Sequence, residues 1–159
     1  MTRFDELLRR LIDGRVEFVI IGGVAAVAQG YDGSTFDFDI CAKFTPDNLD
    51  RLVASLCNVG LRFAPPSERP VTERGTGLMA FHYLAWRTDY GRLDVIRDVA
   101  PLGSFDEVLP RSEPVELYSR TCRILGLDGL IAAKEHLGRD KDKRMLPALH
   151  ALRVLRSRG

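Results

Sequence analysis

The spacing of apolar residues changes several times along the chain, and each spacing predicts a type of secondary structure. Residues 4–12 place apolar side chains three or four positions apart, with arginines and acids between them, which predicts an amphipathic helix. Residues 16–21 form a short, mostly β-branched run, typical of a strand that is buried on both faces. The pair Gly22-Gly23 ends this strand, and the small residues 24–29 predict a short helix that packs closely on a sheet.

Polar and apolar residues alternate over 35–41, which predicts a second strand. Thr45 and Pro46 are residue types that favour the N-cap and the first position of the next helix. Residues 64–77 are rich in proline, glycine and charge and predict an exposed loop. The remaining predicted elements are strands over 78–87 and 93–97 joined by a turn at 88–91, a loop through Pro101, Pro110 and Pro114, a hairpin from 115–118 and 122–125, and helices over 127–137 and 140–156 separated by Gly138.

The composition narrows the class of protein without identifying it. The chain has 159 residues, the size of one domain with a substantial core. Its net charge is +1, and no block of one sign predicts a nucleic-acid-binding or membrane-binding surface. Its three cysteines fit neither a disulfide framework nor a zinc site. The N-terminus lacks the apolar run of a secretory peptide and no segment has the length of a membrane span, so we expect a cytoplasmic protein.

Two carboxylates share one face of the predicted second strand. Because side chains alternate along a strand, Asp37 and Asp39 point the same way, whereas Phe38 and Ile40 point the other way. A third acid, Asp94, lies within a later apolar strand. Buried carboxylates that lie close together repel one another unless a cation neutralises them. Hard oxygen ligands suit Mg²⁺ or Mn²⁺, so the three acids predict a metal site that would attract phosphate.

Each of these features also has an explanation that involves no ligand. A glycine pair after a strand is usually only a turn, although it also lets the backbone amides of the following helix approach a phosphate. An Asp-x-Asp strand is often a solvent-exposed face, and an acid such as Asp94 commonly caps a strand or pairs with an arginine. The combination of the features in this order therefore carries the argument.

The chain resembles the nucleotidyltransferase superfamily, which includes DNA polymerase β, the CCA-adding enzymes and antibiotic nucleotidyltransferases. The resemblance is carried by three motifs in this order: Gly22-Gly23, Thr35-x-Asp37-x-Asp39 and Leu93-Asp94-Val95. The tail, LDGLIAAK at 127–134 followed by GRDKD at 138–142, is similar to the short bacterial branch related to abortive-infection and type IV toxin–antitoxin nucleotidyltransferases. The resemblance implies an α/β (α+β), polymerase β-like fold with a short mixed sheet and helices on one face. It implies a catalytic core over 1–126 and a C-terminal helical segment over 127–159 that packs on the same domain.

The resemblance also implies roles for individual residues. Asp37, Asp39 and Asp94 would be the catalytic residues and the metal ligands. The triphosphate-binding residues would be Gly22, Gly23, Ser34, Thr35 and Lys134, with Asp142 positioning nearby groups. Read without the resemblance, Lys134 and Asp142 are ordinary surface residues of a helical tail. The chain departs from the family at Gly33, a position where relatives commonly carry a basic residue.

The activity implied by this resemblance is metal-dependent transfer of a nucleoside monophosphate from a nucleoside triphosphate to a hydroxyl group, with Mg²⁺ or Mn²⁺ as cofactor. The acceptor stays open between an RNA or tRNA 3′ end, a protein hydroxyl and a small molecule, and a cognate toxin or antitoxin partner is one further expectation. A second hypothesis is a nucleotide-binding or partner-binding module without turnover, as in an antitoxin. A third is an RNA-binding protein that uses its basic C-terminal end.

Overall fold

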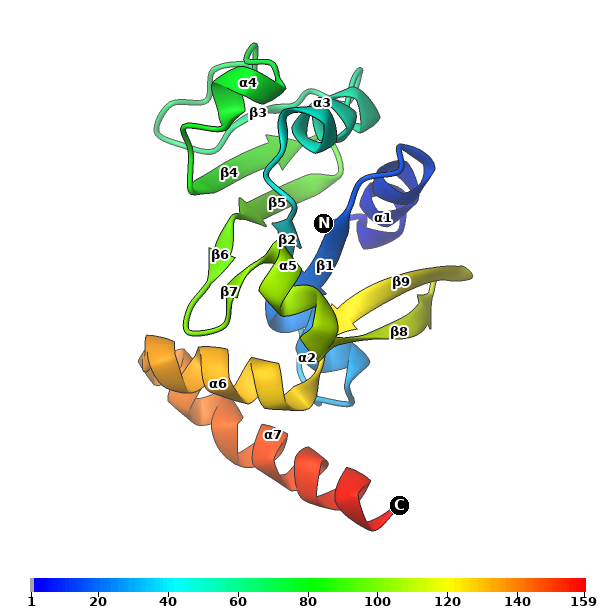
Figure 1. The fold of residues 1–159 in the computed structure, drawn as a ribbon, viewed down its shortest axis with the longest axis vertical. Helices are drawn as coiled ribbons and strands as arrows, with labels where there is room; N and C mark the ends of the chain where they lie inside the picture. The colour runs from blue at the N-terminus through cyan, green and yellow to red at the C-terminus, as the bar shows by residue number, and fades with distance from the viewer. Residues whose placement is uncertain (1) are drawn as a thin grey trace.

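The computed structural model describes residues 2–159 and shows a seven-stranded mixed sheet with helices packed around it (Figure 1). The strand order is β3-β4-β5-β2-β1-β9-β8. The strands of this sheet are β1 (Phe18–Ile21), β2 (Asp37–Ala42), β3 (Arg62–Phe63), β4 (Tyr83–Thr88), β5 (Gly91–Ile96), β8 (Ser112–Leu117) and β9 (Arg120–Leu125), and a separate ribbon is formed by β6 (Asp98–Val99) and β7 (Gly103–Ser104). The predicted mixed α/β architecture is confirmed, with a larger sheet than expected.

All five predicted helices are present: α6 has the predicted bounds, and the other four have shifted ends. The helices are α1 (Phe4–Asp13), α2 (Gly22–Ala28), α3 (Pro46–Ser55), α4 (Gly75–Leu78), α5 (Phe105–Val108), the 3₁₀ helix η1 (Leu109–Arg111), α6 (Leu127–Leu137) and α7 (Asp140–Arg158). Thr45 is the N-cap of α3, as predicted, because its hydroxyl accepts a hydrogen bond of 3.3 Å from the Asn48 backbone amide.

The pairing of the central strands determines which residues meet. β2 runs antiparallel to β1 and parallel to β5, so Ile21 lies beside Asp39, and Asp39 lies beside Asp94. β4 pairs antiparallel with the other edge of β5, and β9 pairs parallel with β1. Two of the three acids singled out in the sequence are therefore direct neighbours across two central strands, although they are far apart in the chain.

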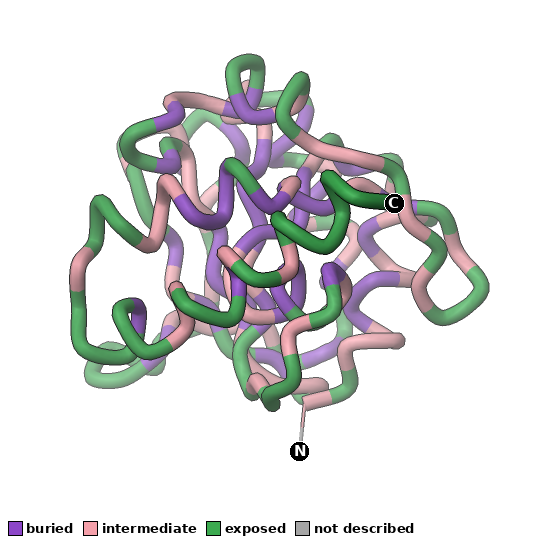
Figure 2. The backbone as a smooth tube through the Cα atoms, turned by 90° about the horizontal axis from the view of Figure 1, so that it is seen from below, coloured by how far each residue is buried: buried purple, intermediate pink, exposed green. Residues whose placement is uncertain are grey.

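One face of the central strands lies in the hydrophobic core. Phe38 and Ile40 of β2 are at most 1% exposed, and the Phe38 ring packs edge-on against Phe4 of α1, with ring centroids 5.7 Å apart. Figure 2 shows the buried segments concentrated towards the middle of the molecule. Because side chains alternate along a strand, β2 presents Asp37 and Asp39 on the opposite face. The apolar residues between the acids thus hold the strand in place while the acids face away from α1.

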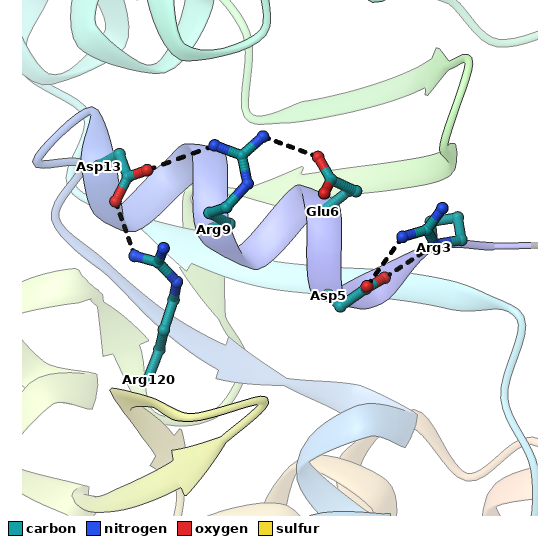
Figure 3. Close-up of polar contacts among 6 residues, drawn as sticks. All are labelled: Arg3, Asp5, Glu6, Arg9, Asp13 and Arg120. Carbon is teal, nitrogen blue, oxygen red and sulfur yellow. Dashed lines mark hydrogen bonds and ion pairs between the residues drawn. The ribbon is translucent and has the colours of Figure 1, made fainter.

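The outer face of α1 carries a row of ion pairs (Figure 3). Arg9 lies 2.8 Å from Glu6 and 3.5 Å from Asp13, at the three- and four-residue spacings that bring helical side chains together. Asp13 also accepts a hydrogen bond of 2.7 Å from Arg120 of β9, which links the helix to the edge hairpin. Each of these exposed pairs contributes less than about 1 kcal/mol, so the buried apolar face of α1 determines its position.

The strand predicted from residue 78 begins only at Tyr83, so the first part of that prediction is wrong. Gly75–Leu78 instead form α4, and the Gly75 amide donates a 2.6 Å hydrogen bond to Asp50 on α3. A four-residue helix is too short for an apolar period to distinguish it from the start of a strand. The contact with α3 decides its conformation.

Two further predictions are corrected between residues 98 and 117. Pro114 belongs to β8 and not to a loop, which is possible because β8 is the edge of the sheet, where a residue without an amide hydrogen is tolerated. The segment around Pro101, predicted as irregular, contains β6, β7 and α5. Phe105 and Val108 of α5 are buried, and α5 contacts β1 and β2. Burial of these two side chains therefore fixes a short helix that periodicity does not reveal.

The C-terminal helices α6 and α7 lie side by side at one end of the molecule (Figure 1). Gly138 ends α6 with φ at +61°, a left-handed conformation that glycine adopts readily. α6 also contacts α2, which brings the tail next to the Gly22-Gly23 turn. The division of the chain at residue 126 stays a prediction. Within residues 2–159, no helix combines the length and the apolar character needed to cross a membrane.

Candidate active site

A cavity of about 830 Å³ lies between the acid-bearing face of the sheet and the C-terminal helices. Its walls come from the first turn of α2, the loop before β2, the strands β2, β4 and β5, and the facing parts of α6 and α7. The residues predicted to form a site that line it are Gly22, Gly23, Ser34, Thr35, Asp37, Asp39, Asp94 and Lys134. The fold therefore collects eight of the nine candidate residues around one cavity, although they come from four separate segments of the chain.

Asp39 and Asp94 form the centre of this site. They are paired on adjacent parallel strands, and Asp94 is only 5% exposed. Burial, followed by a hydrogen bond and charge repulsion from Asp94, raises the pKa of Asp39 to about 7. The two carboxyls thus share one environment that disfavours two full negative charges, and at neutral pH a proton or an added cation is needed to stabilise the pair.

Asp94 has partners of its own on the neighbouring strands. The Tyr83 hydroxyl of β4 donates to Asp94 Oδ1 at 2.8 Å, and Arg92 Nε lies 3.0 and 3.1 Å from the two carboxylate oxygens. Arg92 Nη2 in turn donates to the Tyr83 hydroxyl at 3.2 Å. These contacts satisfy the buried carboxylate and fix its orientation, whereas within residues 2–159 Asp39 forms no ion pair and interacts with the charges of Lys134 and Arg139 only at longer range.

Asp37 lies on the same face of β2 as Asp39, opposite Arg92 in the register with β5. It lines the cavity but is exposed to solvent. Within residues 2–159, no three Asp, Glu, His or Cys side chains are grouped closely enough to bind a metal ion by themselves. The structure therefore brings Asp39 and Asp94 together as predicted, and places Asp37 beside them at the edge of the cavity.

The glycine turn is packed directly against these acids. Gly22 opens α2 with φ at +66°, and a β-carbon there would lie 2.5 Å from Asp39 Oδ2. A β-carbon on Gly23 would lie 2.6 Å from the Thr35 hydroxyl oxygen. The sequence predicted that both glycines precede the helix, but they form its first turn. The close approach explains why both positions lack a side chain, and it keeps the backbone of this turn at the wall of the cavity.

Gly22→Ala is expected to lower any activity of this site at least about tenfold, because the new methyl group displaces the Asp39 carboxylate and strains the backbone. Gly60→Ala is the matched control, since Gly60 has the same φ of +66° and its β-carbon would lie 2.6 Å from a carboxylate oxygen of Asp89, away from the cavity. Both variants should lose similar stability in thermal unfolding, and only Gly22→Ala should lose activity. Equal activity losses would mean that backbone strain alone is responsible.

Lys134 and Asp142 meet at the junction of the two C-terminal helices. Lys134 Nζ lies 3.1 Å from Asp142 Oδ1, and Arg139 Nε donates to Asp142 Oδ2 at 2.6 Å. Asp142 is fully buried, and its Oδ2 also accepts the Arg139 backbone amide at 3.2 Å. Burial acts to raise the pKa of Asp142, but hydrogen bonds from Arg139 and Lys134 outweigh it and hold the pKa at about 2. Asp142 therefore does not line the cavity and instead holds two cations at its rim.

The cavity has opposite charges on its two sides. Asp37, Asp39 and Asp94 lie on the sheet, and basic residues of the C-terminal helices face them. The basic residues that line the cavity from α6, α7 and the turn between them are Lys134, Arg139, Lys141 and Arg144. Gly33 also lines the cavity and brings no charge, so the positive charge in this site comes from the C-terminal helices and from Arg92. Such an arrangement suits a ligand that carries both a metal ion and phosphate groups.

Asp39→Asn is expected to stabilise the metal-free protein at pH 8 by on the order of 2 kcal/mol, seen as a rise in Tm of several degrees. The folded-state pKa of Asp39 is about 7, above its ordinary value of 3.8, so its contribution to wild-type stability is present below pH 4 and lost as the pH rises through 7. The Tm difference between variant and wild type, measured with a chelator, should grow from pH 4 to pH 8. Asp32→Asn changes an exposed acid that does not line the cavity and serves as the control. A Tm difference that is constant with pH would contradict the raised pKa.

No protein-family model matches the chain, and no curated protein is similar to it in sequence. Solved structures share its fold. The lincosamide antibiotic adenylyltransferase LnuA, solved with lincomycin bound, superposes with a TM-score of 0.62 at 14% identity over 95% of this chain and 98% of that one. TM1012 from Thermotoga maritima, provisionally assigned as a nucleotidyltransferase, gives 0.57 at 14% identity over 93% and 94% of the two chains. ANT(2″)-Ia, solved in complex with adenylyl-2″-tobramycin, gives 0.51 at 14% identity over 93% and 95%. At this identity the likeness shows the fold alone, which is the polymerase β-like nucleotidyltransferase fold.

Three residues of the site were not singled out in the sequence. Tyr83 and Arg92 surround Asp94, and Arg139 shares Asp142 with Lys134. Arg92 had a usable signal, because a residue two positions from Asp94 on a strand lies on the same face. Arg139 had one as well, because it lies three residues before Asp142 at the start of a helix, whereas Tyr83 had none, since its contact depends on the pairing of β4 with β5.

Proposed function

We propose that this protein is a metal-dependent nucleotidyltransferase that moves a nucleoside monophosphate from a nucleoside triphosphate to a hydroxyl group of a small molecule. The observation that carries the proposal is the pair of Asp39 and Asp94, held against the Gly22 turn and facing a row of cations across the cavity. The shared fold with LnuA and ANT(2″)-Ia supports this reading.

The residues suit a divalent cation, which the fold implies. Asp39 and Asp94 offer hard carboxylate oxygens, and burial together with the neighbouring Asp94 raises the pKa of Asp39, an effect that a bound cation would offset. Asp39 and Asp94 would therefore hold Mg²⁺ or Mn²⁺, with Asp37 on the same face of the sheet. A bound cation of this kind neutralises triphosphate charge and activates the attacking hydroxyl.

The chain's own groups would position the two substrates. Backbone amides in the first turn of α2, with Ser34 and Thr35, would contact the phosphates, and Lys134 would approach them from α6. The acceptor oxygen would attack the α-phosphorus, the bond to the β-bridging oxygen would break, and pyrophosphate would leave. Asp94 would help to activate the acceptor hydroxyl and would take up its proton. Catalysis would come mainly from positioning and electrostatics.

A small hydroxylated molecule is the acceptor that we favour. LnuA was solved with lincomycin and ANT(2″)-Ia with an adenylylated tobramycin, and this chain spans 98% and 95% of those chains. An RNA or tRNA 3′ end, a protein hydroxyl and a toxin–antitoxin partner are the competing acceptors or partners. Cell lysate divided into small-molecule, RNA and protein fractions, each incubated with α-labelled triphosphates and Mg²⁺, separates them. Label in the small-molecule fraction supports the proposal, and label confined to RNA or protein contradicts this choice of acceptor.

A nucleotide-binding module without turnover is the second candidate function. It is favoured by the ion pair of Arg92 with Asp94, which occupies a carboxylate that a catalytic metal would need. The same labelling experiment discriminates between the two functions. Nucleotide binding in equilibrium dialysis, with no transfer to any fraction in Mg²⁺ or Mn²⁺, would identify the module.

A further inference from the structure

Arg92 lies in the middle of the acidic group. On the cavity face of β5 it is two residues from Asp94, and in the register with β2 it is directly opposite Asp37. Both Arg92 and the two acids line the cavity. Since Lys134 is engaged with Asp142, Arg92 is the cation that the described structure places in contact with the catalytic carboxylates.

The contacts of Arg92 are strong but reversible. Its Nε lies within 3.1 Å of both oxygens of Asp94, and its Nη2 is 3.2 Å from the Tyr83 hydroxyl. The Asp94 side chain is 8% exposed, whereas the Arg92 side chain is 34% exposed. Asp94 is therefore fixed, and the guanidinium is the partner with room to move.

A guanidinium and a divalent cation compete for the same carboxylate oxygens. Arg92 stabilises Asp94 when no other cation is present, because a buried carboxylate without a partner is costly. A metal ion that is bound by Asp39 and Asp94 together must take over at least one of the oxygens that Arg92 contacts. The displaced guanidinium remains in a cavity that would then contain phosphate oxygens, which a guanidinium binds as well as it binds a carboxylate.

We propose that Arg92 is an exchangeable counter-ion: it neutralises Asp94 in the free protein, and it turns to the triphosphate when metal and nucleotide bind. This inference rests on the proposed function, because it assumes a metal–triphosphate ligand. It assigns Arg92 a second role in the bound state, as the phosphate-binding base that Gly33 does not provide. It also explains why Arg92, a basic residue that cannot bind a metal ion, lies among the acids of the site.

Two binding measurements without turnover test the exchange. The first is Mn²⁺ binding to the metal-free protein, followed by electron paramagnetic resonance. Arg92→Gln removes the competing charge, so Mn²⁺ should bind about five to ten times more tightly than to wild type. The second is binding of inorganic tripolyphosphate at saturating Mn²⁺, which should be about tenfold weaker in Arg92→Gln because a charged donor is lost.

The opposite signs of the two effects separate an exchange from structural damage, which would weaken both. Arg87→Gln is the matched control: Arg87 is the cross-strand neighbour of Arg92 on β4, exposed, and makes no ion pair within residues 2–159. Both affinities should stay within about twofold of wild type in this control. Arg92→Met, which keeps the apolar stem, replaces Arg92→Gln if thermal unfolding shows that the latter does not fold.

The exchange is overturned if Mn²⁺ binds Arg92→Gln no more tightly than wild type, if tripolyphosphate affinity is unchanged, or if neither protein binds Mn²⁺. These outcomes differ from failure of the proposed function. A protein that never transfers a nucleotide, but shows the two opposite shifts, would retain the Arg92 exchange and lose the catalytic assignment. A protein that transfers nucleotides without the shifts would retain the catalytic assignment alone.

Discussion

Asp39→Ala is expected to lower nucleotidyl transfer at least about 10³-fold while the protein stays folded. Asp39 adjoins Asp94 on the central strands, and its carboxylate would help to hold the metal ion, which would supply positive charge to the triphosphate. Removing it takes away a ligand that is needed in the transition state, so the loss should appear in kcat more than in KM for the acceptor. Initial rates of labelled product formation measure the effect.

Asp32→Asn is the control for this substitution. Asp32 is an exposed acid in the loop before β2 and does not line the cavity, so its transfer rate should stay within about twofold of wild type. Asp39→Asn should be as inactive as Asp39→Ala, because the amide keeps the volume but loses the charge. Residual transfer above about a tenth of the wild-type rate in both Asp39 variants would show that the pair of Asp39 and Asp94 is not essential for catalysis.

Asp142→Ala is expected to destabilise the protein by about 3 kcal/mol and to weaken triphosphate binding by about tenfold. Asp142 is fully buried and holds both Lys134 and Arg139, so its removal leaves two cations without their carboxylate at the junction of α6 and α7. We place the loss of stability at the lower end of the range for a broken buried ion pair, because the Arg139 side chain is half-exposed and can be solvated by water. Thermal unfolding and calorimetric titration with a nucleotide analogue measure the two effects.

The pH dependence of the lost stability shows whether the charge of Asp142 is its cause. The pKa of Asp142 is held at about 2, below its ordinary value of 3.8, so its stabilisation is present above pH 4 and is lost as the pH falls from 4 towards 2. The Tm difference between wild type and Asp142→Asn should shrink over this interval. Asp140→Ala, an exposed acid in the same first turn of α7, is the matched control and should cost less than about 1 kcal/mol. A loss for Asp142→Asn that persists unchanged at pH 2 would indicate packing and not charge.

The parts of the fold that could be predicted are those with a long apolar period or a strong local signal. Helices α1 and α3 have a clear amphipathic period, and Thr45 and Gly138 mark the start of α3 and the end of α6. The alternation in β2 correctly placed Asp37 and Asp39 opposite Phe38, because a period of two is a direct consequence of strand geometry. The short helices α4 and α5 are held by contacts with residues distant in the sequence, and β6 and β7 are two-residue strands that pair with each other, so none of the four has a local pattern long enough to predict it.

The candidate site, like the fold, could be predicted from the sequence only in part. The acids and glycines could be named from their order along the chain, but their neighbours could not. That Asp94 pairs with Arg92 and Tyr83 depends on the register of three strands. The sequence reading allowed an arginine partner for Asp94 as an alternative to a metal, and the structure shows that partner. Whether Arg92 gives way to a metal ion is a question of energy that neither the sequence order nor the strand register determines.

The most direct test of the central claim follows the label from two differently labelled triphosphates into the acceptor. Purified protein with Mg²⁺ and the small-molecule fraction is incubated with either α-labelled or γ-labelled nucleoside triphosphate, in parallel with Asp39→Ala. Nucleotidyl transfer predicts a product that carries the α-label and no γ-label, pyrophosphate in equal amount, and neither in the variant. A product that carries the γ-label, or an α-labelled product that persists in Asp39→Ala, would contradict the account.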